Sequence, residues 1–440
     1  MLSTIDLEHA LLNQRSVLIA YSGGLDSSIL LYQLVQLRKK YTDLRLRAAY
    51  IDHGIHNDSK KWIIHCQNQC TTWKVPLVVH SVQVNSKGQG IESSARQVRY
   101  NALYKMLLTG EVLLTGHHQD DQCETVLLAL KRGRGPAGIA GMLPSKNQRG
   151  SYHLRPLLTY TREKLEELAH YHGLIWIEDD SNQDIRYDRN FLRLKIIPLL
   201  NKRWPYFSST VSRSAKLCGE QERLLDECLL DTLNSLIDSS NSLDYIPLLT
   251  MSSVRRAALL RRWIARQYNG ELPSYDSLKR IWKEVAIARP DANPSLKIGI
   301  KEIRRFRSRL YFMSLKKSLI NIKLLWEPPW KPLSLPDGLG QLTQSLNGIA
   351  LRYPTIHTIV NVRFCAYGLF KIIGRSRSRS LKKIWQEHEI PPWNRTRTPL
   401  IFYGDVLIAA PGIFITLEGA PEIDQEPWHI AWETSVLNKN

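Results

Sequence analysis

The sequence has few cysteines for its length and lacks any long apolar segment. Its 440 residues contain six cysteines, spread from Cys66 to Cys365, so a dense disulfide framework of the secreted kind is excluded and free thiols are expected. No apolar run reaches the roughly 18 residues that a membrane helix needs. The first residues carry acids where a secretory signal would carry a basic stretch and then an apolar one. We therefore expect a cytoplasmic protein with no membrane partner.

Acidic residues are scarce relative to basic ones. The chain has 60 Lys and Arg residues against 41 Asp and Glu residues, a net charge of +19, which predicts attraction to a polyanion. Two basic clusters stand out, at residues 301–310 and 371–397. Both are interrupted by aromatic, Gly or Pro residues, which favours folded RNA over a lipid surface, although a solvated basic face is the alternative for either one. The expected RNA contacts are Arg304, Arg305, Arg307, Arg375, Arg377, Arg379, Lys382 and Lys383.

The chain is too long for one hydrophobic core, so two or three domains are expected. Its first part alternates short apolar runs with helical stretches, which predicts an α/β fold with a doubly wound, mainly parallel sheet. The turns that follow parallel strands gather at the carboxyl edge of the sheet, where such folds bind ligands. The expected strands lie at 16–21, 44–51, 76–84 and 111–116.

The pattern changes after residue 203. A continuous helical pattern indicates a connector helix. Helices and a strand-like segment at 302–313 come next, then a Pro-rich segment, then strands that surround the second basic cluster. We expect a catalytic domain at 1–203, the connector helix at 204–238, an α+β domain at 239–320, a linker at 321–345 and a β-rich domain at 346–435.

The most informative segment is YSGGLDSSIL at 21–30, where an apolar strand meets a Gly-Gly turn and a helix. Glycines let the backbone approach a phosphate closely, and a helix start offers unpaired N–H groups to an anion. The segment lacks the Gly-Lys-Ser/Thr ending of a Walker A loop and is not a GxGxxG loop. SGGLDS instead resembles the pyrophosphate loop of the N-type ATP pyrophosphatases, which cleave ATP to AMP and pyrophosphate while adenylating an oxygen.

Further segments resemble one branch of that family, the tRNA(Ile)-lysidine synthetases, in the same order along the chain. Two positions depart from the branch's pattern: His56 stands where Arg is usual, and Asp180 where Pro is usual. The matching segments are IDHGIHNDS at 51–59, ESSARQVRY at 92–100, GHHQDDQCETVLLALKRGRG at 116–135, RPLL at 155–158, EDDSNQDIRYDRNFLR at 178–193 and the segment 374–412.

The resemblance implies an ATP-dependent ligase with Mg²⁺ as its cofactor. Its substrates would be free L-lysine and the wobble cytidine in the CAU anticodon of tRNA(Ile). Lysine would be joined to C2 of that cytidine through an adenylated intermediate, with release of AMP and pyrophosphate, which changes codon specificity from AUG to AUA. No obligatory protein partner is implied, and the chain is expected to act as a monomer or homodimer.

The chemistry of individual residues agrees with this resemblance. Asp121 and Glu124 stand at i and i+3 on an expected helix, so their carboxylates share one face. They could hold a metal, recognise the lysine amine or act as a base, and a solvated surface pair is the alternative. Arg96 and Arg99 have the same spacing, which suits phosphate, although a surface pair of Glu92 with Arg96 is the other reading. The expected ATP contacts are Ser22, Gly23, Gly24, Leu25, Asp26, Ser27, His53, Arg96 and Arg99. The expected lysine and cytidine contacts are His117, Asp121, Glu124, Arg189 and Asn190. The expected catalytic residues are Asp26, Asp121, Glu124 and Arg189, with Asp26 and Asp121 as Mg²⁺ ligands.

Two other functions compete with this prediction. One is a different enzyme of the same ATP-using group, such as a tRNA thiolase or a GMP synthetase. A tRNA cytidine thiolase should carry a Cys-x-x-Cys pair, whereas Cys66 and Cys70 have another spacing that suits packing on a helix face; a GMP synthetase should carry a glutaminase domain. The other is a non-catalytic RNA-binding protein, which would not need Asp26, Asp121 and Glu124 together with an intact SGGLDS loop.

Overall fold

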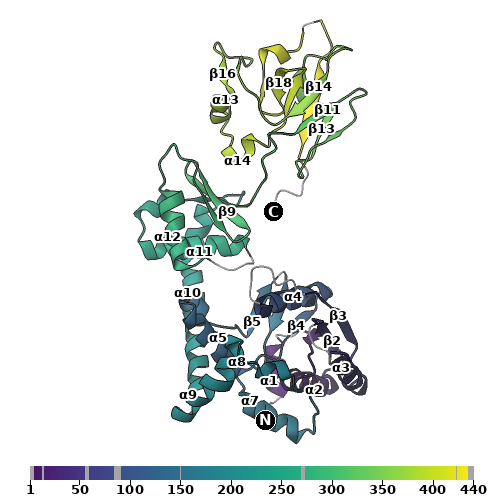
Figure 1. The fold of residues 1–440 in the computed structure, drawn as a ribbon, viewed down its shortest axis with the longest axis vertical. Helices are drawn as coiled ribbons and strands as arrows, with labels where there is room; N and C mark the ends of the chain where they lie inside the picture. The colour runs from purple at the N-terminus through teal and green to yellow at the C-terminus, as the bar shows by residue number, and fades with distance from the viewer. Residues whose placement is uncertain are drawn as a thin grey trace. The chain divides into compact units, whose positions relative to one another are not determined.

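The computed structural model describes residues 4–11, 14–54, 59–83, 91–148, 150–268, 273–422 and 424–434 (Figure 1). The chain divides into two compact units, Met1–Cys228 and Leu229–Asn440. Among the described helices, none is both long and apolar enough to cross a membrane.

The first unit is built on a six-stranded sheet whose order is β3-β2-β1-β4-β6-β5. All its strand pairs are parallel except the pair of β5 with β6 at one edge. The chain moves outward from β1 to β3 and then crosses back to β4 on the other side of β1. The strand order therefore reverses between β1 and β4, which is where doubly wound folds bind their ligands. The strands are β1 (Ser16–Ala20), β2 (Arg45–Asp52), β3 (Leu77–Ser81), β4 (Val112–Leu114), β5 (Ser145–Gln148) and β6 (Ser151–Leu154).

Helices cover both faces of this sheet, as the predicted α/β fold requires. Val17 and Ile19 of β1 pack into one apolar cluster, and Leu18 packs into another on the opposite face, because successive strand side chains point to opposite sides. The first cluster also takes Cys66 and Cys70, so the predicted packing role of these cysteines is confirmed. Burial raises the pKa of each thiol to about 12. The helices are α1 (Thr4–Ala10), α2 (Leu25–Lys40), α3 (Ser59–Thr72) and α7 (Arg162–Tyr171) against the first cluster and α4 (Ile91–Met106) against the second.

Short helices complete the first unit, and one long helix leads from it into the second. α5 (Gln119–Lys131) begins soon after β4, and the long α10 (Phe207–Leu236) lies where a connector helix was expected. A π-helical turn, η2 (Leu192–Ile196), precedes Pro198, which cannot donate a backbone hydrogen bond. The remaining elements are α6 (Pro136–Ile139), η1 (Asp180–Gln183), α8 (Asp188–Phe191) and α9 (Ile197–Arg203).

The second unit begins with a four-stranded antiparallel sheet of order β7-β10-β9-β8, packed against helices. The strand-like segment expected at 302–313 is two strands joined by a tight turn. Arg307 adopts a positive φ of 53° in that turn. The pattern of apolar residues alone did not predict the turn, because no Gly or Asn marks it. The elements are β7 (Leu243–Asp244), η3 (Pro247–Thr250), α11 (Ser253–Gln267), α12 (Tyr275–Arg280), η4 (Ile281–Ala286), β8 (Ser295–Ile298), β9 (Lys301–Phe306) and β10 (Arg309–Ser314).

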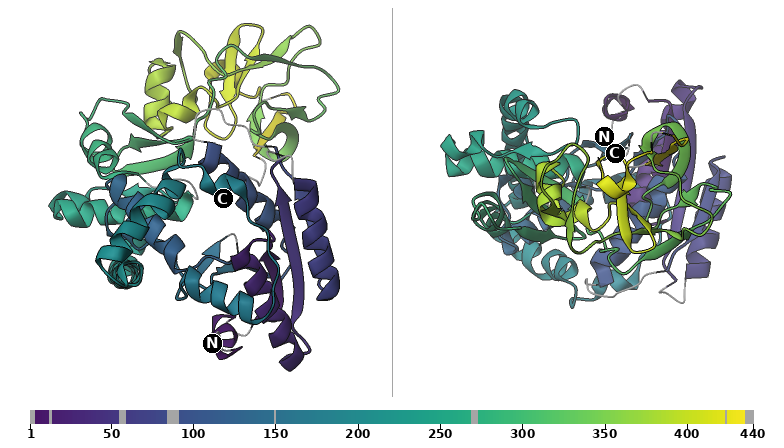
Figure 2. Two further views of the ribbon diagram at one scale, coloured as in Figure 1. Left: turned by 60° about the horizontal axis from the view of Figure 1, so that its bottom comes forward. Right: turned by 90° about the horizontal axis from the view of Figure 1, so that it is seen from above.

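The last part of the chain is β-rich, as predicted, and appears in yellow and light green in Figure 2. The segment 321–345, expected as a linker, instead contributes two whole strands and the start of a third to its sheets. Trp326 and Trp330 of that segment are buried, with ring centroids 5.1 and 4.9 Å from that of Trp428. Burial of these aromatic side chains holds the Pro-rich segment in the domain core, so it is not a linker. The elements are β11 (Lys323–Trp326), β12 (Leu333–Ser334), β13 (Gln341–Leu351), β14 (Val360–Arg363), β15 (Leu369–Phe370), β16 (Arg379–Ser380), α13 (Leu381–Glu387), α14 (Pro392–Arg395), β17 (Leu400–Tyr403), β18 (Val406–Ala410), β19 (Phe414–Ile415), η5 (Leu417–Gly419) and β20 (Trp428–Glu433).

Candidate active site

The Gly-Gly turn between β1 and α2 is held in one shape by its own side chains. Gly23 has a φ of +78°, and a Cβ there would lie 2.8 Å from the Cys66 Sγ. Both the backbone conformation and the lack of space for a side chain therefore favour glycine at this position. The Ser27 hydroxyl donates to the Gly24 carbonyl at 3.0 Å, and its oxygen lies 3.2 Å from the Ser22 hydroxyl. No side chain caps the N-terminus of α2 at Gly24 in the described structure. The first-turn N–H groups of this helix are therefore suited to an anion.

The loop that follows β4 lies against the same turn. A Cβ on Gly116 would lie 2.8 Å from the Asp26 carbonyl oxygen, so this loop touches the first turn of α2 at the point where the strand order reverses. The segment after α7 also reaches this point, since the Ile177 N–H donates to the Gly23 carbonyl at 2.9 Å. Two segments far apart in the sequence thus lie against the turn.

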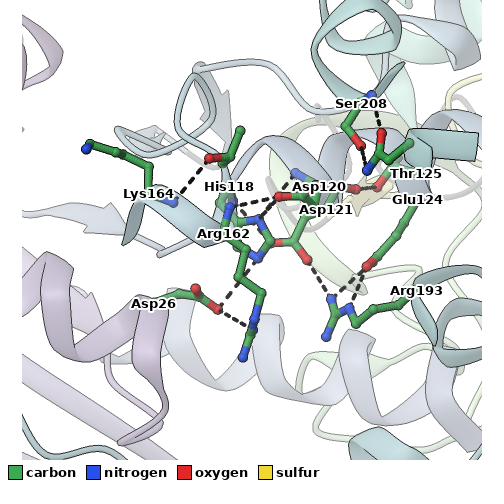
Figure 3. Close-up of polar contacts among 12 residues, drawn as sticks. Asp26, His118, Asp120, Asp121, Glu124, Thr125, Arg162, Lys164, Arg193 and Ser208 are labelled. Carbon is green, nitrogen blue, oxygen red and sulfur yellow. Dashed lines mark hydrogen bonds and ion pairs between the residues drawn. The ribbon is translucent and has the colours of Figure 1, made fainter. Parts of the chain in front are cut away.

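His118 lies at the centre of a group of carboxylates (Figure 3). Its Nε2 is 3.4 Å from an Asp121 oxygen and 3.7 Å from the Asp26 Oδ2, and its Nδ1 is 3.5 Å from the Asp120 Oδ2. Burial alone would lower the pKa of this imidazole, but the surrounding carboxylates outweigh it and raise that pKa to about 9. Arg162 approaches the same Asp26 oxygen at 3.8 Å.

Asp26 is the carboxylate of this group that fits a cation. Its Oδ1 is buried and has no hydrogen-bond partner within the described part of the chain. Burial raises the pKa of its carboxyl, against the opposing effect of His118. Asp121 differs, because its Oδ1 accepts from Arg189 and Arg193 and its Oδ2 accepts from the His118 backbone N–H. No group of three or more His, Cys, Asp or Glu residues is arranged to hold a metal ion in the ranges that the structure describes.

Asp121 and Glu124 form a buried cluster with Arg189 and Arg193. Arg189 Nε donates to Glu124 at 2.5 Å and Arg193 Nε at 2.6 Å, while both guanidiniums reach the Asp121 Oδ1 at 3.0 Å. The Glu124 side chain is 0% exposed, so the alternative of a solvated surface pair is wrong. Burial opposes ionisation of Asp121, yet His118 and the two arginines hold its carboxyl pKa well below the usual range.

Four members of these clusters were missing from the sequence-based selection of site residues: His118, Asp120, Arg162 and Arg193. His118 and Asp120 belong to GHHQDD, which lies in a segment already singled out from the sequence. Arg193 stands one helical turn after Arg189, and that spacing was the available signal for it. Arg162 reaches Asp26 only through the fold, and no local pattern indicated it.

His117 lies beside the arginine-rich helix α4. Its Nδ1 is 2.7 Å from the Thr115 hydroxyl and its Nε2 is 3.3 Å from the Tyr100 hydroxyl. Burial lowers the pKa of His117 well below its usual value, so the ring is neutral. The guanidiniums of Arg96 and Arg99 lie 5.3 and 5.5 Å from the centre of the Tyr100 ring. The Glu92 side chain of the alternative surface pair lies outside the described residues.

The other expected substrate contacts occupy two different places. The Asn190 amide donates to the Asp184 carbonyl at 3.0 Å, which ties α8 to the preceding loop. His53 directly follows β2 at the carboxyl edge of the sheet. His56 lies outside the described residues, and Asp180 begins the turn η1.

Three family models match the chain: a PP-loop domain over residues 3–200, a TilS substrate binding domain over 243–311 and a TilS substrate C-terminal domain over 360–432. The tRNA(Ile)-lysidine synthase of Salmonella schwarzengrund is 51% identical, over 98% of this chain and 100% of its own. The enzyme of the same name from Serratia proteamaculans is 51% identical, over 95% of each chain. The chain belongs to the tRNA(Ile)-lysidine synthase family. Membership over the full length, with an ATP-using PP-loop domain, makes it a ligase and disfavours both a thiolase and a non-catalytic RNA-binding protein.

In this member of the lysidine synthase family, the expected RNA contacts differ in exposure. Arg305 is buried, and its guanidinium donates to the carbonyls of residues 286, 288 and 289 at 2.5 to 3.0 Å, which gives it a structural role. Arg304 lies 2.9 Å from a Glu302 oxygen, and the exposed Arg307 pairs with Glu389. Around α13, Arg375 and Arg379 lie 3.5 and 3.7 Å from Glu387, and the exposed residues beside them are Arg377, Lys382 and Lys383.

Proposed function

We propose that this chain joins free L-lysine to C2 of the wobble cytidine in the CAU anticodon of tRNA(Ile). In the first step, the cytidine O2 attacks the α-phosphorus of ATP and pyrophosphate leaves. In the second step, a lysine amine attacks C2, loses a proton, and AMP leaves with the oxygen. The main support is the meeting of the phosphate loop and the buried acid–arginine cluster at the point where the strand order reverses, in a chain 51% identical over its length to lysidine synthases.

The first step requires charge on the phosphates to be neutralised. The uncapped N-terminus of α2, the hydroxyls of Ser22 and Ser27, and the cations Arg96 and Arg99 are suited to this task, and His53 lies at the same sheet edge. Mg²⁺, when bound, would neutralise further phosphate charge. Asp26 would hold it, because its Oδ1 is buried without a hydrogen-bond partner in the described structure. Asp121 is a weaker candidate ligand, since both its oxygens accept hydrogen bonds.

The second step requires a lysine ammonium to be bound and then deprotonated. Asp121 and Glu124 are the buried carboxylates that match it, and both are paired with guanidiniums. We propose that the ammonium takes the place of one guanidinium, which keeps each buried carboxylate paired. The displaced Arg189 would then be available to the phosphate of AMP. His117 and Asn190 complete the proposed lysine and cytidine contacts.

We assign tRNA binding to the two C-terminal domains, at about 239–320 and 346–435, which follow the connector helix in the sequence. The exposed cations around α13 and the β9–β10 turn support this assignment through phosphate contacts. Arg305 is left out of this surface because it is buried in its own domain.

The test is a reaction of the purified protein with ATP, lysine and tRNA(Ile) carrying CAU, followed by nucleoside mass spectrometry. Lysidine in the digest, and ATP–pyrophosphate exchange that depends on this tRNA, are expected. The methionine tRNA, which shares the CAU anticodon, is the matched control and should stay unmodified. A thiolated nucleoside, or exchange that does not depend on tRNA, would overturn the proposal.

A further inference from the structure

His117 belongs to a row of hydrogen bonds that leads from β6 through the loop after β4 to α4. The Thr115 hydroxyl joins two histidines, at 2.7 Å from His117 Nδ1 and 2.9 Å from His153 Nε2. Beyond His153, its Nδ1 lies 3.1 Å from an Arg155 guanidinium nitrogen and 3.1 Å from the Tyr104 hydroxyl. At the other end, His117 Nε2 lies 3.3 Å from the Tyr100 hydroxyl. We call Arg155, His153, Thr115, His117 and Tyr100 the histidine chain.

The first link of the histidine chain has only one possible direction. A guanidinium donates hydrogen bonds and cannot accept them, so Arg155 must donate to His153 Nδ1. That nitrogen therefore carries no proton, the Tyr104 hydroxyl beside it also acts as a donor, and His153 is neutral with its proton on Nε2. Burial agrees, since it lowers the pKa of His153 to about 3, and Arg155 adds to the effect. Arg155 is itself anchored, because its other terminal nitrogen donates to the Leu143 carbonyl at 2.7 Å.

The remaining links follow by proton counting. His153 Nε2–H donates to the Thr115 oxygen, so the single hydroxyl proton of Thr115 is directed to His117 Nδ1. His117, neutral through burial, then carries its proton on Nε2 and donates to the Tyr100 oxygen. The Tyr100 proton is left for another acceptor. Every donor in the histidine chain thus points from Arg155 towards Tyr100.

We infer that Arg155, His153 and Thr115 are positioning residues that fix His117 as the neutral tautomer protonated on Nε2 and make the Tyr100 hydroxyl a hydrogen-bond donor beside Arg96. The ordering fits the strand pairing, since Leu113 of β4 pairs with His153 of β6 and both strands end at the same edge. The inference rests on the proposed function only in placing His117 and Tyr100 at the substrate. The tautomer itself is independent of which reaction the site performs.

The direct test is NMR of the full-length protein labelled with ¹⁵N-histidine. Long-range ¹H–¹⁵N correlations distinguish the two neutral tautomers from the imidazolium, and the variants His117→Gln and His153→Gln assign the signals. We expect both rings to be neutral and protonated on Nε2 from pH 7 to 8. In Thr115→Val, which keeps the side-chain shape without the hydroxyl, His117 should populate both tautomers. Thr115→Ser should restore the single one.

The catalytic consequence is measured on the same variants. Thr115→Val should lower kcat for lysidine formation by about tenfold, the scale of one lost hydrogen bond, with little change in the KM for ATP. Thr115→Ser should recover most of this loss. Thr71→Val is the matched control, because Thr71 is exposed on α3 and its hydroxyl donates to the Gln67 carbonyl of the same helix.

Each outcome decides a different point. A wild-type His117 protonated on Nδ1, or charged at pH 7, overturns the inference even if Thr115→Val does not fold. Equal kcat in Thr115→Val, Thr115→Ser and the wild type would show that the histidine chain has no role in the reaction. The predicted tautomers in a protein that makes no lysidine would leave the inference standing and refute the proposed function instead.

Discussion

Arg189 donates a hydrogen bond of 2.5 Å to Glu124, whose side chain is completely buried. A buried carboxylate needs a partner of opposite charge, and here two arginines supply it from one turn of a neighbouring helix. The partners come from helices that are far apart in the sequence, so this contact joins α5 to α8. The same contact links the fold of the site to its proposed chemistry, because a lysine ammonium could replace a guanidinium on this carboxylate.

Loss of either carboxylate charge in this cluster should reduce the reaction strongly. We expect Asp121→Asn and Glu124→Gln each to lower kcat for lysidine formation by at least about 100-fold, the scale for loss of a base or of a charged substrate contact. Asp188→Asn is the matched control, since this acid forms an exposed pair with Lys131. Unfolding midpoints of the same samples separate loss of fold from loss of chemistry. Turnover like that of the wild type in both variants would leave the cluster with a structural role only.

The phosphate loop should be separable from tRNA binding. We expect Asp26→Ala and Ser27→Ala to abolish AMP release while leaving the affinity for tRNA unchanged, because the exposed basic residues lie in other domains. Asp43→Ala, which removes an exposed acid near Arg15, should keep the activity of the wild type. AMP release and filter binding are measured on each variant. Near-normal AMP release from either loop variant would refute the assignment of this loop.

His153 should make the protein sensitive to acid. Its folded pKa of about 3 lies below the ordinary value of 6.5, so the unfolded state binds a proton first as pH falls. The contribution of neutral His153 to the free energy of unfolding is therefore complete above pH 6.5. It decreases below that pH by at most about 1.4 kcal/mol per pH unit. Between pH 6.5 and 5, the wild type should lose on the order of 1.5 kcal/mol more unfolding free energy than His153→Gln. Urea titrations at both pH values measure this difference, and parallel losses would count against a buried neutral His153.

Local patterns predicted the framework of the site, and the fold supplied the rest. The short apolar run at 16–21 and the SGGLDS segment after it were enough to place a strand, a turn and a helix. The spacing of Asp121 and Glu124 correctly put both carboxylates on one face. Such patterns describe one element at a time.

Contacts between elements could not be predicted from the sequence, because local patterns describe one element at a time. The approach of Arg162 to Asp26 depends on the packing of α7 against α2, which no local pattern encodes. Arg305 was expected to bind RNA because it lies in a basic run. Its burial follows from the π-helical turn η4, whose terminal carbonyls need a donor.

The charges around α13 give opposite predictions for two kinds of variant. Arg375 and Arg379 flank Glu387, which partly neutralises them, and Arg377 is exposed beside them. Each phosphate that a cation neutralises contributes about 0.9 to the slope of log affinity against log salt. The triple variant Arg375→Ala, Arg377→Ala, Arg379→Ala should therefore weaken tRNA binding and flatten this slope by up to about 3, while ATP binding stays intact. Glu387→Gln should strengthen binding, because it removes the competing carboxylate without changing the size of the side chain. Filter-binding titrations of the three proteins at several salt concentrations measure both effects. Identical slopes in all three would mean that these arginines face solvent only, and that tRNA is held elsewhere on the chain.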